Sequence, residues 1–166
     1  MSVINDNHIL LEAPAVLLLE LNQQLEHAIN LEKADRGNIQ VLVPGTDTLK
    51  IIVHQGFQKE FLDHFSTVKA FDRSACGRAI GIGRTVYIND VMLDIGFTPH
   101  REIATAAGFR AVKSVPIPGR DGLLGILSVH FSQPKSYWEE CRLAQPIFRI
   151  AALMESNAAF LSNWPI

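Results

Sequence analysis

Cysteine and histidine carry the most versatile chemistry in this chain of 166 residues, which contains two of the former and six of the latter. Cys76 precedes Gly77 at the predicted start of a helix, where the helix dipole would lower the thiol pKa and suit a redox or nucleophilic role. The alternative is that Cys76 is a small buried hydrophobic residue. With Cys141 the chain has too few cysteines for a disulfide framework, and this count fits a reducing, cytoplasmic compartment.

The histidines show no metal-binding pattern. None belongs to an HExxH motif or an i, i+4 pair, so no metal site is predicted. A single histidine can ligate a haem iron, and His100 is the candidate, although an ordinary hydrogen-bonded histidine is the alternative. His130 is expected to share a strand face with Ile126 and Ser128.

Asp90 and Ser114 are candidate polar contacts for a small ligand. Asp90 follows a predicted strand and either accepts a hydrogen bond in a pocket or caps a turn. Ser114 lies mid-strand between apolar residues, so its hydroxyl needs a partner if it is buried. The full set of predicted ligand-binding residues is Phe71, Cys76, Ile88, Asp90, Phe97, His100, Phe109, Val112 and Ser114. No catalytic residue and no particular cofactor is predicted.

Basic residues outnumber acidic ones in the middle of the chain. This excess suggests either an anionic ligand or acidic partner, or simply a solvated surface. The whole chain has a formal net charge of −2, which gives no reason to expect nucleic acid or an anionic membrane as a partner. The basic residues in the middle of the chain are Lys69, Arg73, Arg78, Arg84, Arg101, Arg110, Lys113 and Arg120.

The elements that must position these residues follow a simple order. Residues 38–43 and 49–55 alternate and flank a turn cluster, which predicts a hairpin with Leu49, Ile51 and Val53 on one face. A second hairpin is predicted at residues 110–117 and 123–131. Between the hairpins, short helices and one short strand at residues 85–89 should cover the sheet, with Asp72 or Ser74 capping a helix that starts near residue 74.

Helices are predicted at both ends of the chain. Pro14 suits the first turn of a helix that runs to about residue 31. Leu11, Leu18 and Leu25 fit a short heptad register, so this helix either packs on its own sheet or pairs across a dimer. A helix from Ser136 to about Leu161 should be kinked at Pro146. The predicted fold class is α+β, with both terminal helices on one face of an antiparallel sheet and residues 57–107 covering the other.

The order of these short motifs resembles GAF domains, most closely those of bacterial sensor histidine kinases. The resemblance covers residues 34–155 within a single domain, residues 1–166. It rests on ACGRA at residues 75–79, RTVYINDV at 84–91, AGFRAVKSVPI at 107–117, RDG at 120–122 and LGILS at 124–128.

The resemblance implies a five- or six-stranded sheet, a ligand pocket beneath the covering segments and parallel homodimers through the terminal helices. It names no ligand, because the family binds many. The cyclic-nucleotide motif and the bilin-attachment cysteine of some GAF domains are absent here. GAF-fold methionine sulfoxide reductases use several cysteines in the covering loops, whereas Cys76 stands alone in that region.

The expected function is therefore that of a cytoplasmic ligand-sensing module in a two-component or related signalling system, acting on a kinase or another output partner, and not that of an enzyme. Two alternatives remain. One is a GAF domain that serves only dimerisation or interaction, and the other is a redox sensor or enzyme based on Cys76.

Overall fold

The structure, a computed structural model, describes residues 6–165, with side chains from Pro14 onward. Within these residues, six strands form one antiparallel sheet in the order β3-β2-β1-β6-β5-β4. The strands are β1 (Arg36–Leu42), β2 (Thr48–Gln55), β3 (Val68–Lys69), β4 (Val86–Ile88), β5 (Ala111–Gly119) and β6 (Gly122–Phe131). The predicted α+β class and both hairpins are confirmed.

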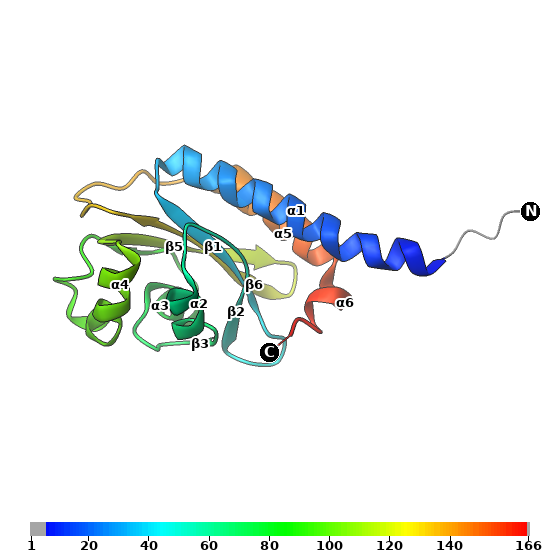
Figure 1. Ribbon diagram of the computed structural model, residues 1–166, viewed down its shortest axis with the longest axis horizontal. Helices are drawn as coiled ribbons and strands as arrows, with labels where there is room; N and C mark the ends of the chain where they lie inside the picture. Colours follow the sequence, from blue (N-terminus) through cyan, green and yellow to red (C-terminus); the bar gives the residue numbers. More distant parts are fainter. Residues whose placement is uncertain (1–5, 166) are drawn as a thin grey trace, which may run out of the picture.

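Helices cover both faces of the sheet (Figure 1). One face carries α1 (Asp6–Glu32) and α5 (Ala144–Ser156), which lie side by side, and α6 (Ala158–Leu161) follows α5. The other face carries α2 (Lys59–His64), α3 (Ala75–Ile82), the 3-10 helix η1 (Ile95–His100) and α4 (Arg101–Ala107). The terminal helices therefore share one face as predicted, and the middle of the chain covers the other.

Strand alternation divides the core into two layers. Ile39 and Leu127 pack with α1 residues such as Leu21 in the layer beneath the terminal helices. Val112 and Ile126 pack with covering residues in the second layer, which is rich in phenylalanine: Phe57, Phe61, Phe65, Phe97 and Phe109. The central strands β1, β6 and β5 thus contribute side chains to both layers.

One buried ion pair ties the end of α1 to the sheet. The Lys113 Nζ of β5 lies 2.6 Å from Glu32 Oε1, and each side chain is only 4% exposed. The Lys113 ammonium also donates to the Glu139 carbonyl oxygen at 3.0 Å. Lys113 therefore holds both the end of α1, through Glu32, and the segment before α5, through Glu139, against β5.

The structure corrects the predicted start of the first helix. That helix begins at Asp6, so Pro14 lies inside α1 rather than in its first turn. A proline ring has a helical φ, and the helix passes through it at the cost of one hydrogen bond. Leu18 and Leu25 of the heptad register are partly or fully buried within the molecule. Leu11, the first position of that register, lies outside the described side chains.

The C-terminal helix also differs from its prediction. It begins at Ala144 instead of Ser136, because the preceding segment is held by tertiary contacts: Trp138 Nε1 donates to Asn89 Oδ1 at 2.6 Å. Pro146 then falls in the first turn, where its missing N–H breaks no helical hydrogen bond, so the predicted kink is wrong. The helical path instead changes at Asn157, between α5 and α6.

A β-bulge corrects the predicted facing of β2. Ile39 pairs with Val53 and Gln40 with Ile51, which leaves Ile52 as the extra residue. Leu49 and Ile51 consequently face the covering layer, whereas Val53 packs beneath the terminal helices. The expectation that all three share one face is wrong at Val53.

Candidate functional site

A small cavity lined by buried side chains lies between the centre of the sheet and the covering elements. Its volume is about 20 Å³, which is room for one molecule the size of water. Polar side chains from the sheet and from the start of α3 reach it: Asn38, Gln40, Ser74, Cys76, Ser114, Ser128 and His130. The rest of its wall is apolar and comes mostly from Phe61, Phe65, Phe97, Phe109 and Val112.

The register of the sheet explains why the polar residues meet. Asn38 of β1 lies opposite Ser128 of β6, and Ser128 lies opposite Ser114 of β5. Gln40 and His130 are each two residues from this row and therefore share its face. The result is a polar island inside a core that is otherwise apolar.

Three atoms of this island lack a hydrogen-bond partner among the described residues. They are Asn38 Oδ1, Gln40 Oε1 and His130 Nδ1, and their residues are 3%, 1% and 5% exposed. Each such buried atom costs about 1–3 kcal/mol when it stays unpaired. By contrast, Ser114 Oγ and Ser128 Oγ bond to each other at 2.7 Å. The cavity is therefore chemically incomplete with protein atoms alone.

His130 is a neutral member of the island. Burial lowers its pKa to about 3, and the positive charge of Arg36 adds to the effect. The rings of Phe57, Phe61 and Phe109 meet the imidazole edge to face, with centroids 4.7–5.8 Å away. At neutral pH the imidazole presents one nitrogen as an acceptor and carries no charge.

The start of α3 supplies the covering wall. Ser74 is the N-cap: its Oγ accepts from Gly77 N at 3.0 Å, and Asp72 Oδ1 in turn accepts from Ser74 N at 2.9 Å. The Cys76 sulfur lies 3.3 Å from the same Ser74 hydroxyl. Burial raises the pKa of the Cys76 thiol to about 11, so the thiol is protonated and a weak nucleophile.

Five of the nine predicted ligand-binding residues line this cavity: Cys76, Phe97, Phe109, Val112 and Ser114. Ile88 is fully buried in the same core layer but does not reach the cavity. Phe71 is 65% exposed. The structure thus brings five of the nine residues together, and the other four do not line the cavity.

Asp90 and His100 lie outside the cavity. Asp90 accepts from Met92 N at 3.0 Å and pairs with Arg110 at 2.6 Å, which is the geometry of a turn cap. The Arg110 guanidinium lowers the Asp90 pKa. The two ring nitrogens of His100 bond to His64 and to the Asp72 carbonyl oxygen, both at 2.9 Å.

Sequence reasoning missed Asn38, Gln40, Ser74 and Ser128 as site residues and gave His130 only a strand face. A signal for the first two was present, because they alternate with Ile39 and Val41 on a strand that should be buried on both sides. Such a strand ordinarily carries apolar residues at these positions. The positions opposite them on β6 could not be paired before the sheet order was known.

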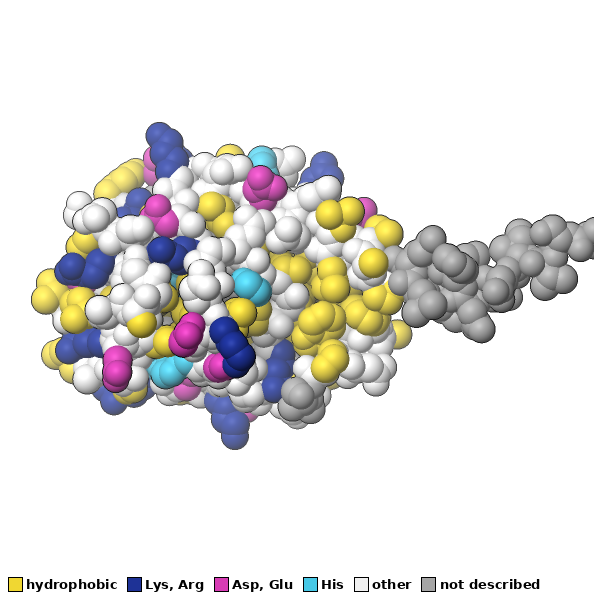
Figure 2. Space-filling model, viewed as in Figure 1, with side chains coloured by type: hydrophobic (Ala, Val, Ile, Leu, Met, Phe, Trp, Pro, Cys, Tyr) yellow, Lys and Arg dark blue, Asp and Glu magenta, His cyan; other side chains and the backbone are white. Residues whose placement is uncertain are grey.

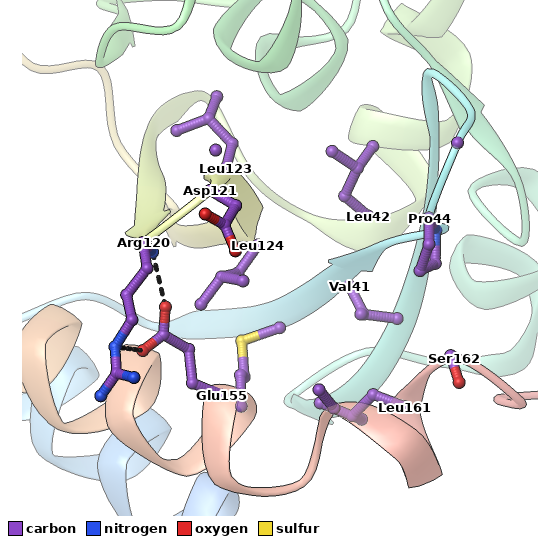
Figure 3. Close-up of a pocket in the computed structure, with 14 residues that line it drawn as sticks. Val41, Leu42, Pro44, Arg120, Asp121, Leu123, Leu124, Glu155, Leu161 and Ser162 are labelled. Atoms are coloured by element: carbon purple, nitrogen blue, oxygen red, sulfur yellow. Dashed lines mark hydrogen bonds and ion pairs between the residues drawn. The ribbon is translucent and has the colours of Figure 1, made fainter.

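A second hollow is an open groove of about 570 Å³ at the far end of the sheet (Figure 3). Leu42, Leu124 and Leu161 line it, and Glu155 closes one side by accepting from Arg120 N at 2.6 Å. Figure 2 shows hydrophobic side chains gathered at the end of the molecule where α6 lies. This groove contains no buried unpaired polar atom among the described side chains.

Among the described residues no group of histidine, cysteine and acidic side chains could hold a metal ion. None of the described helices is long and apolar enough to cross a membrane.

The fold and its covered cavity define a GAF-type domain. A family model for the GAF domain matches residues 8–153, and the chain belongs to this family. None of the curated proteins matches the chain.

Solved structures show the same fold at low sequence identity. A domain of a putative two-component sensor histidine kinase from Sinorhizobium meliloti has 12% identity and a TM-score of 0.60, covering 86% of this chain and 91% of its own. The type II free methionine-R-sulfoxide reductase of Thermoplasma acidophilum has 15% identity and a TM-score of 0.68, with 86% and 96% covered. NreA of Staphylococcus aureus, mutated in its nitrate binding site, has 18% identity and a TM-score of 0.61, with 78% and 94% covered.

Proposed function

We propose that this chain is a small-molecule-sensing regulatory GAF domain of a bacterial signal transduction protein, acting as one domain in the cytoplasm. The observation that carries the proposal is the set of three buried, unpartnered polar atoms around the polar cavity. A core that needed only to be stable would hold apolar residues there, because unpaired buried polar atoms destabilise it.

Two of the structural neighbours support a sensory role. One comes from a protein described as a putative sensor histidine kinase. NreA is described as having a nitrate binding site, so a GAF fold can hold a ligand of only a few atoms. A cavity of about 20 Å³ has room for one water-sized molecule, so a ligand of a few atoms requires the covering segments to move outward, and a nucleotide or a tetrapyrrole is far too large for it.

The proposed signal passes through the central strands to the terminal helices. Asn38 and Gln40 face the cavity, whereas Ile39 between them packs in the layer beneath α1 and α5. A ligand that favours one arrangement of β1 would therefore bias the packing of both helices. We propose that the helices form a parallel homodimer and act on a kinase or another output partner.

The chemistry of the cysteines argues against an enzyme. A free methionine sulfoxide reductase is among the structural neighbours, but the Cys76 thiol has its pKa raised to about 11 by burial. Cys141 is exposed and lies outside the cavity. Cys76 lines the cavity but its thiol stays protonated, and Cys141 is outside the cavity, so neither thiol is suited to thiol-based catalysis there.

The second candidate is a GAF domain that serves only as an interaction module. The small volume of the cavity and the four phenylalanine rings in its wall favour it. In that case the unpartnered atoms would bond to one permanently buried water.

The two candidates are separated by replacing Gln40 with its apolar isostere. Native mass spectrometry would be applied to the wild-type protein, Gln40→Met and the exposed control Gln58→Met after incubation with a bacterial metabolite extract. The sensory proposal expects a small bound mass in the wild type and in Gln58→Met that Gln40→Met lacks. Gln40→Met should also raise the free energy of unfolding by about 1 kcal/mol, because it removes an unpaired acceptor. A wild type that binds nothing would favour the interaction module.

A further inference from the structure

The wall of the polar cavity contains no charged side chain. Its polar members are amides, hydroxyls, a thiol and a neutral imidazole. No Lys or Arg of the covering segments lines the cavity. Arg78 pairs with Asp94 at 2.6 Å, and Arg101 donates to the carbonyl oxygens of Val91 and Asp94 at 3.0–3.1 Å. The local excess of positive charge therefore does not reach the cavity.

Two charged groups of opposite sign lie just outside the wall. Arg36 lies near His130 and donates to the carbonyl oxygens of Gly56 and Gly108 at 2.9–3.2 Å. The Asp72 carboxylate sits at the start of α3, where Ser74 N donates to it. Because one charge is positive and the other negative, the pair gives a buried ion no clear compensation. An anion or a cation in this cavity would lose its hydration without gaining a partner of opposite charge.

The unpaired oxygen atoms in the wall of the cavity require a ligand that donates hydrogen bonds to them. The unpartnered amide oxygens Asn38 Oδ1 and Gln40 Oε1 are acceptors, and His130 Nδ1 is a third acceptor in the tautomer that carries its proton on Nε2. The hydroxyl pair Ser114–Ser128 uses one of its two protons internally and has the other free to donate. The complement of this wall is a molecule with several N–H or O–H groups and one acceptor oxygen.

We propose that the cavity binds a compact, uncharged molecule of the primary amide type, whose N–H groups donate to Asn38, Gln40 and His130 and whose oxygen accepts from Ser114 or Ser128. This proposal rests on the proposed sensory function and names the ligand class for the same site. The volume, about 20 Å³, is room for one water-sized molecule, so α3 has to move outward for the amide group to enter. Each feature of the amide group, including its neutrality, matches one feature of the wall.

Formamide, formate and formamidinium are matched probes for this proposal. All three are planar molecules with three non-hydrogen atoms, and they differ in charge and in hydrogen-bonding role. Each probe would be titrated into ¹⁵N-labelled protein at constant chloride concentration. NMR would record the shifts of the backbone amide signals of Ser114, Ser128 and His130. With three non-hydrogen atoms, even an ideal ligand is held only at about millimolar Kd. Formamide should bind saturably, at least about tenfold more tightly than either ion, which corresponds to about 1.4 kcal/mol.

Variants show whether the observed binding belongs to the cavity. Gln40→Met should weaken formamide binding about tenfold or more, while the exposed substitution Gln58→Met should leave it unchanged. Tighter binding of formate or of formamidinium would overturn the amide class and indicate an anion or cation site. If no probe saturates at 100 mM, the ligand class is wrong.

The two proposals fail in different ways. In one outcome, native mass spectrometry detects a bound mass that depends on Gln40 while the NMR titrations detect no binding of formamide. That result would overturn the ligand class but would still support the sensory function. Absence of both would overturn both.

Discussion

Acid should destabilise this protein through His130 before it titrates the carboxylates. The pKa of His130 is about 3 in the folded protein because the ring is buried, against 6.5 for an ordinary histidine. A folded-state pKa below the unfolded value means that the unfolded chain takes up the proton first. The stabilising effect of neutral His130 is therefore complete above pH 6.5 and is lost as the pH falls towards 3.

The expected magnitude follows from the size of this shift. Each pH unit below 6.5 costs about 1.4 kcal/mol of unfolding free energy, so the loss at pH 5 is about 2 kcal/mol. Asp90 and Asp94 have pKa values lowered from 3.8 by Arg110 and Arg78, and their effect comes at lower pH. The range between pH 7 and 5 therefore isolates histidine titration.

Urea denaturation followed by circular dichroism at pH 7.0, 6.0 and 5.0 measures this effect. His130→Phe removes the titrating ring in a site already surrounded by phenylalanines, and its unfolding free energy should change little over this range. His27→Gln, at an exposed position of α1, should keep the full wild-type slope.

Burial also lowers the pKa of His54 and His64, so their smaller contributions persist in every variant. The reasoning is refuted if wild type and His130→Phe lose stability in parallel. If His130→Phe does not fold, the ring signals of His130 in the wild type decide: they should not titrate between pH 7 and 5.

Three further predictions concern other parts of the molecule. Lys113→Met leaves the buried Glu32 carboxylate without its partner and should lower the free energy of unfolding, measured by chemical denaturation, by about 3–5 kcal/mol. The double variant Lys113→Met/Glu32→Met should regain most of this loss, and equal stability of the single and double variants would contradict the prediction. Cys76 should react with a thiol reagent at pH 8 far more slowly than exposed Cys141, and at the same rate once urea unfolds the chain. Gly125→Ala should abolish folding as judged by circular dichroism, because the new Cβ would lie 1.9 Å from the Gln40 carbonyl oxygen of the neighbouring strand.

Local patterns predicted the parts of the fold that are themselves local. Turn residues and alternation identified both hairpins, and Ser74 capped its helix as expected. The errors arose where a distant contact decides the local structure. Asn89 holds Trp138 and so delays the start of α5, and the bulge at Ile52 reverses the facing of Val53. Neither partner can be identified before the tertiary structure is known.

The candidate site likewise contains residues that the local sequence predicts and residues that only the tertiary structure identifies. Ser114 could be singled out, because a hydroxyl in an apolar strand is conspicuous in the sequence. Asn38 could not be identified as a site residue from the sequence, because only the register of the sheet places it opposite Ser128. The site is a row across three strands, and a row of this kind depends on the sheet order β1-β6-β5. The hairpin of β5 and β6 is local, but the pairing of β1 with β6 joins the N-terminal part of the chain to its C-terminal part.

This row also explains how a cavity of such small volume could affect the whole domain. Ser128 and His130 face it, whereas Leu127 and Val129 of the same strand pack beneath α1 and α5. Lys113, next to Ser114, holds the end of α1 through Glu32. The side chains of a strand alternate on a single backbone, so residues that face the cavity and residues that face the helices are covalent neighbours. The proposed signal would therefore pass from the cavity along these strands to the packing of both terminal helices.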